Sequence, residues 1–191
     1  MSFARSAFLA VSLLSTSALA GPRVALETGL GTVVVELADR QAPITSRNFL
    51  RYVEAGKFDG TSFYRAARSK RDPKQGFVQG GIDHNYKRAF FSIDHEPTSK
   101  TGLKHVDGTI SMARNAPGTA MGDFFITVGP APYLDARPGY PGYAAFGRVV
   151  SGMEVVKRIL AVPTWIGRGS GSVKDQLIIK RVPILRAHRL P

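Results

Sequence analysis

Residues 109–150 read TISMARNAPGTAMGDFFITVGPAPYLDARPGYPGYAAFGRVV, and this stretch decides the fold class. It holds three short runs of apolar and aromatic residues, at 109–113, 124–128 and 144–150, with Gly, Pro and Asp between them. Runs of four to eight such residues, set between turn-forming residues, are typical of β-strands. The stretch therefore predicts several short strands in succession.

The same pattern continues on both sides of this stretch. Residues 23–28 and 32–37 flank Gly29-Leu30-Gly31 and predict a hairpin. Residues 61–66 and 176–185 predict two further strands, with an edge or bulge near Pro183. Many short strands and few helices argue against the alternation of parallel α/β folds. We expect a mostly antiparallel sheet that closes into a barrel, because closure removes exposed edges.

Two segments carry the spacing of amphipathic helices. In the first, Pro43 suits the first turn, and an apolar stripe from Phe49 to Val53 runs on toward Gly56. In the second, Ser151 and Glu154 have the spacing of a capping box ahead of an apolar stripe that ends before residue 163. We expect these two helices to cover the open ends of the barrel.

The composition is that of a globular protein with a strong positive charge. Of the 191 residues, 43% are hydrophobic and 21% are charged, which argues against a disordered chain or a membrane bundle. The absence of cysteine excludes disulfides, thiolate zinc sites and cysteine nucleophiles. Lys and Arg number 26 against 14 Asp and Glu, a formal charge of +12, which attracts anionic partners but does not specify a fold.

Residues 1–20 have the pattern of a secretory signal peptide. Arg5 is followed by a charge-free apolar stretch that closes with Ala18-Leu19-Ala20. A membrane anchor is the alternative, but the apolar core is shorter than the roughly 20 residues of a spanning helix, and Pro22 interrupts it. We expect cleavage after Ala20, a soluble mature domain over residues 21–191 and, in a bacterium, a periplasmic location.

Several other motifs receive an ordinary interpretation. Phosphate-loop, zinc-protease and serine-hydrolase signatures are missing from the sequence, and the glycines at 167–171 open no helix and predict a flexible loop. Two Ile-Asp-His triplets, at 82–84 and at 93–95 before Glu96, could supply metal ligands, but solvated loop residues are expected and no metal site is predicted. The basic run 65–74 lacks interleaved aromatic residues, so nucleic-acid binding is not expected.

Five motifs in order carry a resemblance to a known family. They are Phe63-Tyr64-Arg65, Gly76-Phe77-Val78-Gln79-Gly80-Gly81, Ser111-Met112-Ala113-Arg114, Gly122-Asp123-Phe124-Phe125-Ile126 and Ala145-Phe146-Gly147-Arg148-Val149. With this order and spacing the chain resembles the cyclophilin-type peptidyl-prolyl cis-trans isomerases, most closely their secreted bacterial branch. The resemblance implies a mainly β fold, a closed eight-stranded antiparallel barrel capped by two α-helices.

The resemblance also implies the roles of particular residues. Arg65 is the expected donor to the proline nitrogen of the twisted peptide bond, Phe125 the floor of an apolar recess, and Gln79 a hydrogen-bond partner of the substrate backbone. The other expected substrate contacts are Phe77, Met112, Ala113, Arg114, Asn115, Tyr133, Leu134 and Tyr143. Because isomerisation makes and breaks no bond, no cofactor is expected.

The sequence departs from the common family pattern at several of these positions. Gly76 stands where the family usually places its first pocket phenylalanine, and residues 68–75 form a longer, more basic segment than usual. Asp123 replaces a usual glutamine, Tyr133 a tryptophan and Tyr143 a histidine. A tyrosine still stacks and donates, so a weakened activity is expected, together with poor binding of cyclosporin-type macrocycles.

These observations predict a monomeric, exported prolyl isomerase that acts on proline-containing segments of unfolded or exported proteins. Two alternatives stay open. The groove could serve a non-catalytic chaperone or docking module, which the altered pocket residues favour. The charge could instead serve electrostatic binding to anionic envelope or nucleic acid, which strong salt dependence would reveal.

Overall fold

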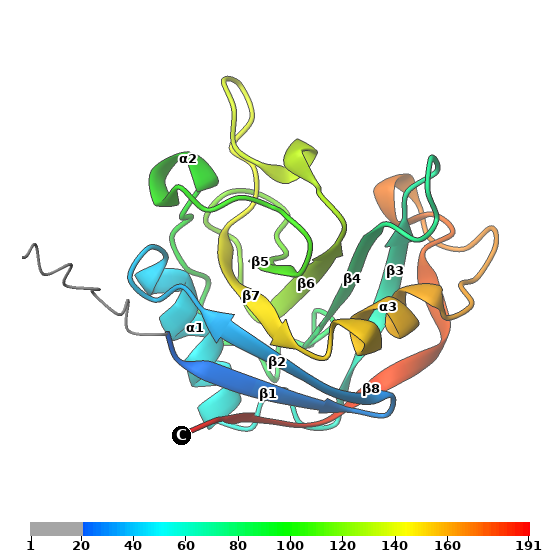
Figure 1. Ribbon diagram of the computed structural model, residues 1–191, viewed down its shortest axis with the longest axis horizontal. Coiled ribbons are helices and arrows are strands. Elements are labelled where there is room, and N and C mark those ends of the chain that lie inside the picture. Colours follow the sequence, from blue (N-terminus) through cyan, green and yellow to red (C-terminus); the bar gives the residue numbers. More distant parts are fainter. Residues whose placement is uncertain (1–20) are drawn as a thin grey trace, which may run out of the picture.

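Eight antiparallel strands close into a barrel in the computed structural model, which describes residues 21–191. Around the barrel their order is β1-β2-β7-β5-β6-β4-β3-β8 (Figure 1). The strands are β1 Arg23–Thr28, β2 Gly31–Leu37, β3 Thr61–Arg68, β4 Gly76–Gly81, β5 Thr109–Met112, β6 Asp123–Val128, β7 Ala145–Ser151 and β8 Leu177–Arg189. The predicted fold class is confirmed, and the predicted signal segment lies outside the described residues.

The β1–β2 hairpin has the predicted position, whereas β4 was not predicted from strand patterning. Three of the six residues of β4 are glycines, so the segment lacks the run of β-branched and apolar residues that marks a strand. The structure explains the glycine at each end. A Cβ on Gly76 would lie 1.9 Å from the Ala67 carbonyl oxygen, and one on Gly81 would lie 2.3 Å from that of Gly122.

Helices α1 (Pro43–Glu54) and α3 (Met153–Ala161) correspond to the two predicted helices. The predicted capping box of α3 is wrong. Ser151 is the last residue of β7, and Gly152 stands at the N-cap in a left-handed conformation with no side-chain cap. A one-turn helix, α2 (Thr98–Thr101), and the 3-10 turns η1 (Pro132–Leu134) and η2 (Gly171–Val173) were not predicted. No helix within residues 21–191 is long and apolar enough to cross a membrane.

One hydrophobic core fills the barrel and extends under both longer helices. Phe49 of α1 packs on Phe124 of β6 in an edge-to-face arrangement, with ring centroids 5.4 Å apart, and Phe63 and Phe146 complete the aromatic cluster. At the α3 side, Val156 and Ile159 are fully buried in the same core. The aromatic residues of several strands and of α1 therefore share one packed interior, which holds the barrel wall rigid.

Helix α1 begins at a carboxylate supplied from a distant part of the chain. Glu96 accepts hydrogen bonds from the backbone N–H groups of Ile44 (3.2 Å) and Thr45 (2.7 Å) and from the Thr45 hydroxyl (2.7 Å). A negative charge at this end also complements the helix dipole. The prediction of a solvated loop residue at Glu96 is wrong, because the residue is 3% exposed.

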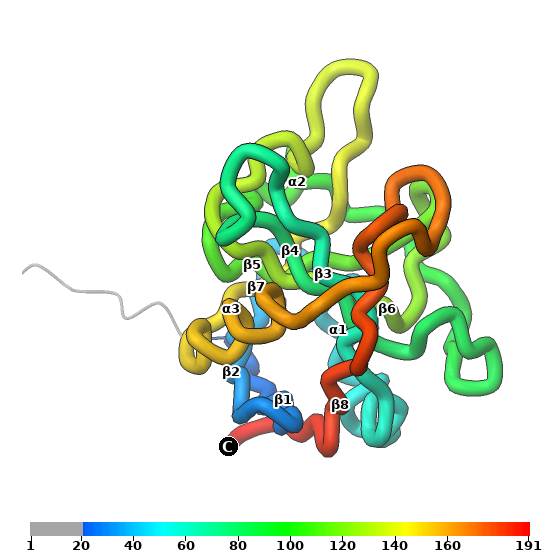
Figure 2. Tube along the Cα trace, turned by 90° about the vertical axis from the view of Figure 1, so that its right-hand side faces the viewer, coloured from blue at the N-terminus to red at the C-terminus, as the bar shows by residue number. Residues whose placement is uncertain are grey.

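The end of α3 is held by Arg68, the last residue of β3. The guanidinium of Arg68 donates to the carbonyls of Leu160 (2.8 Å) and Val162 and to the Thr164 hydroxyl (3.2 Å). Leu160 lies in the last turn of the helix and Val162 is its C-cap, where carbonyls have no partner within the helix. From there the chain runs past β3 before it turns into β8 (Figure 2), and the N–H of Ala66 on β3 donates to the Gln176 carbonyl (2.9 Å). The segment between α3 and β8 is thus fixed beside β3.

The alternation on β6 allows a direct test of the core. Replacing Phe124, which is fully buried, with Ala should lower the free energy of unfolding by about 3–5 kcal/mol, because a large cavity is left. The matched control is Phe91→Ala, since the Phe91 side chain is 93% exposed and should change stability by less than about 0.5 kcal/mol. Urea unfolding of both variants measures the difference, and equal effects would contradict the assigned core.

Candidate active site

Four side chains lie in one row across the outer face of four neighbouring strands. Arg65 on β3 pairs with Gln79 on β4, Gln79 pairs with Phe125 on β6, and Phe125 pairs with Ser111 on β5. Residues directly opposite each other on paired strands point to the same face of a sheet. The backbone register therefore brings together residues that are as much as 60 positions apart in the chain.

A β-bulge at Tyr64 adds one more side chain to this face. The pairing of β3 with β4 shifts between Phe63 and Arg65, so Tyr64 has no partner in the ladder. Simple alternation would place Phe63 and Arg65 on the same face. Instead Phe63 is buried in the core, while both Tyr64 and Arg65 reach Gln79 by hydrogen bonds. The bulge thus turns two consecutive residues toward the site.

The guanidinium of Arg65 is held by three hydrogen bonds. Nη1 donates to Gln79 Oε1 (3.0 Å), Nε to Gln176 Oε1 (2.8 Å) and Nη2 to the Ser172 carbonyl oxygen (2.9 Å). The group also lies over the ring of Phe77, 5.0 Å from its centroid. Burial lowers the pKa of Arg65 from its ordinary value, but an arginine remains charged at neutral pH.

Sequence reasoning missed the two loop residues that hold Arg65. Ser172 lies in η2, next to the glycines at 167–171 that predict a flexible loop, and Gln176 is the first residue of the predicted strand 176–185 and directly precedes β8. A sequence offers no spacing that links residue 65 to residues 172 and 176. Only the pairing of β3 with β8, which sets Arg65 opposite Leu177, brings that segment to the site.

Phe125 forms the centre of a small apolar cluster outside the barrel core. Its ring centroid lies 5.2 Å from that of Phe77 and 5.4 Å from that of Tyr143, the latter in an edge-to-face arrangement. Leu134 and Ala131 complete the buried part of the cluster. Phe124 faces the core, so of the two neighbouring phenylalanines it is Phe125 that faces the recess, as the resemblance implied.

One pocket of about 330 Å³ joins the arginine and the apolar cluster. Predicted site residues that line it are Arg65, Phe77, Gln79, Ala113, Arg114, Asn115, Phe125, Leu134 and Tyr143. Lining residues that were not predicted are His84, Thr119, Met121, Asp123, Ser172 and Val173. Most of the predicted set therefore converges on one concave surface with a few polar groups, the usual form of a small-ligand or peptide site.

Two predicted substrate contacts do not line this pocket. Met112 pairs with Phe124 on β6 and, like it, faces the barrel core, where it is 1% exposed. Tyr133 lies one residue before the pocket-lining Leu134, and its side chain is 55% exposed. Strand alternation explains why Met112 does not line the pocket, because Ser111 rather than Met112 lies on the same face of the sheet as Phe125.

Some backbone N–H groups of residues 113–115 already form hydrogen bonds within the protein. The N–H of Ala113 donates to the Asp123 carbonyl (2.9 Å), so this group is already used within the protein. Asn115 donates its N–H to the Thr119 hydroxyl (3.2 Å). The Arg114 side chain donates to the Gly142 carbonyl and lies over the ring of Tyr143, 4.8 Å from its centroid. Arg114 thus fixes the Tyr143 wall of the pocket.

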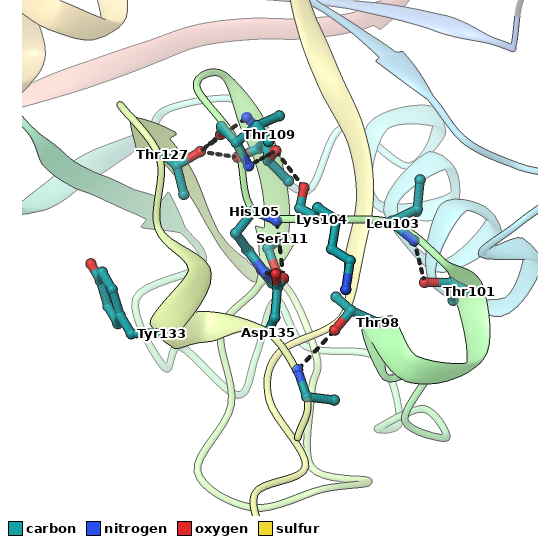
Figure 3. A network of polar contacts seen from close by, with 12 residues as sticks. Thr98, Thr101, Leu103, Lys104, His105, Thr109, Ser111, Thr127, Tyr133 and Asp135 are labelled. Atoms are coloured by element: carbon teal, nitrogen blue, oxygen red, sulfur yellow. Dashed lines mark hydrogen bonds and ion pairs between the residues drawn. The ribbon is translucent and has the colours of Figure 1, made fainter. Parts of the chain in front are cut away.

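A buried histidine, His105, lies beside the apolar cluster and belongs to a polar network with Ser111 and Asp135 (Figure 3). The ring of His105 stacks on Phe125, with centroids 5.9 Å apart and planes at 13°. Its Nδ1 lies 2.7 Å from Asp135 Oδ1 and its Nε2 lies 2.9 Å from the Ser111 hydroxyl. Because a carboxylate only accepts hydrogen bonds, Nδ1 carries the proton and Nε2 accepts from Ser111. Burial lowers the pKa of His105, although the bond to Asp135 opposes this shift.

Apart from Arg65 and His84, which line this pocket, the residues of the metal-ligand triplets and of the basic run lie outside it. Within residues 21–191 no group of three or more His, Asp or Glu side chains is placed to hold a metal ion. In the second Ile-Asp-His triplet, His95 bonds the Pro141 carbonyl (3.0 Å). The basic run does not form one surface, because Arg65 belongs to the pocket and Arg68 to the end of α3.

Comparison with known families matches residues 23–188 to the family described as cyclophilin type peptidyl-prolyl cis-trans isomerase/CLD. The chain belongs to this family. Its relatives include the peptidyl-prolyl cis-trans isomerase of Acinetobacter baylyi, 37% identical over 153 residues, which span 80% of this chain and 79% of the relative. Another, cyp18 of Streptomyces antibioticus, is 38% identical over 160 residues, which span 82% and 93%.

The barrel also matches solved cyclophilin structures. A cyclophilin type peptidyl-prolyl cis-trans isomerase of Cryptosporidium parvum, crystallised in the presence of the dipeptide Ala-Pro, superposes with a TM-score of 0.71. That match covers 88% of this chain and 99% of the other at 24% identity, so it bears on the fold alone. Family and relatives together give the activity of this cyclophilin as peptidyl-prolyl cis-trans isomerisation.

The buried histidine generates a pH prediction. A folded-state pKa below the ordinary 6.5 means that the unfolded chain binds the extra proton first, so this contribution to stability is present above pH 6.5 and is lost as the pH falls below it. Replacing His105 with Gln should flatten this part of the stability–pH curve. Urea unfolding of wild type and variant between about pH 5 and pH 7.5 measures the change.

The control for this prediction is His95→Gln, which removes a partly exposed histidine outside the recess. Comparison of the two variants separates the loss of the buried ring from the loss of a histidine elsewhere in the protein. Parallel curves for wild type and His105→Gln would show that His105 titrates alike in the folded and unfolded states, and would contradict the assignment of a buried neutral ring.

Proposed function

We propose that this pocket is the catalytic site of the isomerase and that Arg65 is its catalytic group. Rotation about an X-Pro bond must break amide resonance, at a barrier of roughly 18–20 kcal/mol. In the twisted state the proline nitrogen is pyramidal and regains a lone pair, so a fixed donor aimed at it lowers the barrier. Each of the three guanidinium nitrogens of Arg65 donates one N–H to the protein. Two of the five N–H groups of the side chain therefore remain for the substrate.

The proline ring would lie on Phe125, between Phe77 and Leu134. An apolar recess of this kind holds the ring while the preceding residue turns, and partial exclusion of water strengthens the interaction with the guanidinium. The observation that carries the proposal is that one pocket contains both the arginine and this recess. The activity of the family, isomerisation about X-Pro bonds, supports proline-containing peptides as the substrate class.

We further propose that the protein is exported and assists the folding of exported proteins. The support is the sequence of residues 1–20, in which Arg5 precedes a charge-free apolar stretch that ends in small residues. In a bacterium the mature domain would act in the periplasm, as a monomer. Isomerisation requires no cofactor there, because no bond is made or broken.

A non-catalytic peptide-binding module is the second candidate. The observation that favours it is that Asp123 and Tyr143, two departures from the family pattern, both line the pocket. Such a module would suppress aggregation of unfolded clients equally well in wild type and in an Arg65→Ala variant. Loss of that effect in the variant would exclude it.

The arginine provides the direct test of the catalytic proposal. Arg65→Ala should reduce kcat/KM on an Ala-Pro peptide by about 100-fold, because a preorganised donor to the transition state is lost. The kcat/KM of Arg65→Lys should lie between those of the wild type and of Arg65→Ala, since lysine keeps the charge but lacks the planar fork of donors. NMR exchange spectroscopy gives the rates and urea unfolding checks the fold. An Arg65→Ala variant that is folded and fully active would refute the proposal.

Export is tested on the full chain. Expressed with a C-terminal tag in a bacterium, the protein should be recovered from the periplasm. Its intact mass should be that of a chain that begins at Gly21. Leu13→Arg, which places a charge in the apolar stretch, should leave the full-length chain in the cytoplasm. An unprocessed wild-type chain in the cytoplasm would contradict export without touching the assignment of the catalytic site.

A further inference from the structure

A chain of three hydrogen bonds links Arg65 to a buried carboxylate. Arg65 Nη1 donates to Gln79 Oε1 (3.0 Å), Gln79 Nε2 donates to the Tyr64 hydroxyl (2.8 Å), and that hydroxyl donates to Asp123 Oδ1 (3.1 Å). Gln79, Tyr64 and Asp123 are each less than a tenth exposed. The chain ends at the backbone N–H groups of Asp83 (2.8 Å) and His84 (3.3 Å), which donate to the two oxygens of Asp123.

The two ends of this chain fix the direction of every bond, because the guanidinium only donates hydrogen bonds and an ionised carboxylate only accepts them. An ionised Asp123 only accepts hydrogen bonds, so the single hydroxyl proton of Tyr64 must point to it. The Tyr64 oxygen is then an acceptor, and it takes the amide N–H of Gln79. The Gln79 amide is thereby oriented with its oxygen toward Arg65, where it accepts from the guanidinium. A side-chain amide at position 123 can donate as well as accept, so the guanidinium alone would then fix the order, without an acceptor-only group at the other end.

We propose that Tyr64 and Asp123 are positioning residues, which hold the Arg65 guanidinium in its catalytic orientation through the amide of Gln79. Neither residue is assigned a contact with the reacting bond. The inference rests on the proposed function of Arg65. It gives a role to the bulge, which turns Tyr64 to the site face, and to Asp123, one of the departures from the family pattern.

The charged and titratable groups around Asp123 come from several elements. They are Tyr52 on α1, Tyr64 on β3, Asp83 and His84 after β4, and Arg181 on β8, which bonds Asp83 at 2.7 Å. The His84 ring nitrogen lies 3.6 Å from Asp123 Oδ2. Burial raises the pKa of Asp123, and the two backbone N–H donors oppose this. The carboxylate therefore takes up a proton at a higher pH than an ordinary aspartate, and Tyr64 then loses its charged, acceptor-only partner.

Tyr64→Phe tests the proposal, because it removes one hydroxyl and keeps the ring. We expect kcat to fall about fivefold to tenfold and KM to change less than about twofold, as for the loss of one positioning hydrogen bond. Tyr86→Phe, at an exposed tyrosine, is the matched control, and its kcat and KM should equal those of the wild type. Equal kcat in Tyr64→Phe and wild type would overturn the proposal.

A double-mutant comparison separates positioning from a general effect on the fold. In an Arg65→Ala background, Tyr64→Phe should cause no further loss, because the group that it positions is gone. An equal loss in both backgrounds would indicate a merely structural role for Tyr64. If Arg65→Ala itself has no effect, it is the proposed function that fails, so the two failures are distinguishable.

Asp123→Asn supplies an independent test through the pH profile. For the wild type, kcat/KM should fall on the acid side at a pH above the ordinary aspartate range, and it should recover as Asp123 ionises. The amide does not titrate, so the acid limb should disappear from the profile of Asp123→Asn, with activity at neutral pH reduced about threefold to tenfold. An unchanged acid limb in Asp123→Asn would overturn the role assigned to the carboxylate.

Discussion

Backbone pairing between β3, β4, β6 and β5 holds Arg65, Gln79, Phe125 and Ser111 in one row across the outside of the barrel. Every other feature of the pocket depends on this register. A slip of one residue on any strand would turn its member of the row toward the core. The packed aromatic interior prevents such a slip, because Phe63 and Phe124 occupy the opposite face of the same strands.

The row has a charged end and an apolar end, and a polar network supports each of them. At one end, Gln79, Gln176 and the Ser172 carbonyl compensate the partial desolvation of Arg65. At the other, His105 stacks on Phe125 and is fixed by Asp135 and Ser111. Since both supports are hydrogen-bonded within the protein, and the one at His105 is also buried, the pocket is formed before any peptide enters it.

Most of the barrel and of its site follow from the sequence, and the exceptions have physical causes. Alternating runs predict seven of the eight strands, but not β4, whose glycines are needed where backbones approach closely. The resemblance identifies Arg65, Gln79 and Phe125, which the structure brings together. It does not identify Tyr64, because alternation places Tyr64 on the wrong face until a bulge is known. Gln176 and Ser172 reach the site only through the long-range pairing of β8 with β3.

The last strand has a consequence for the order in which the molecule can form. Strand β8 pairs with both β1 and β3, so the sheet stays open along two edges until residues 177–189 have been synthesised (Figure 1). Contacts between segments so distant in sequence form slowly, since a long loop must close before any pairing energy is gained. The nascent chain therefore exposes unpaired backbone for nearly the whole of translation, and during that interval it can be captured by other proteins or aggregate.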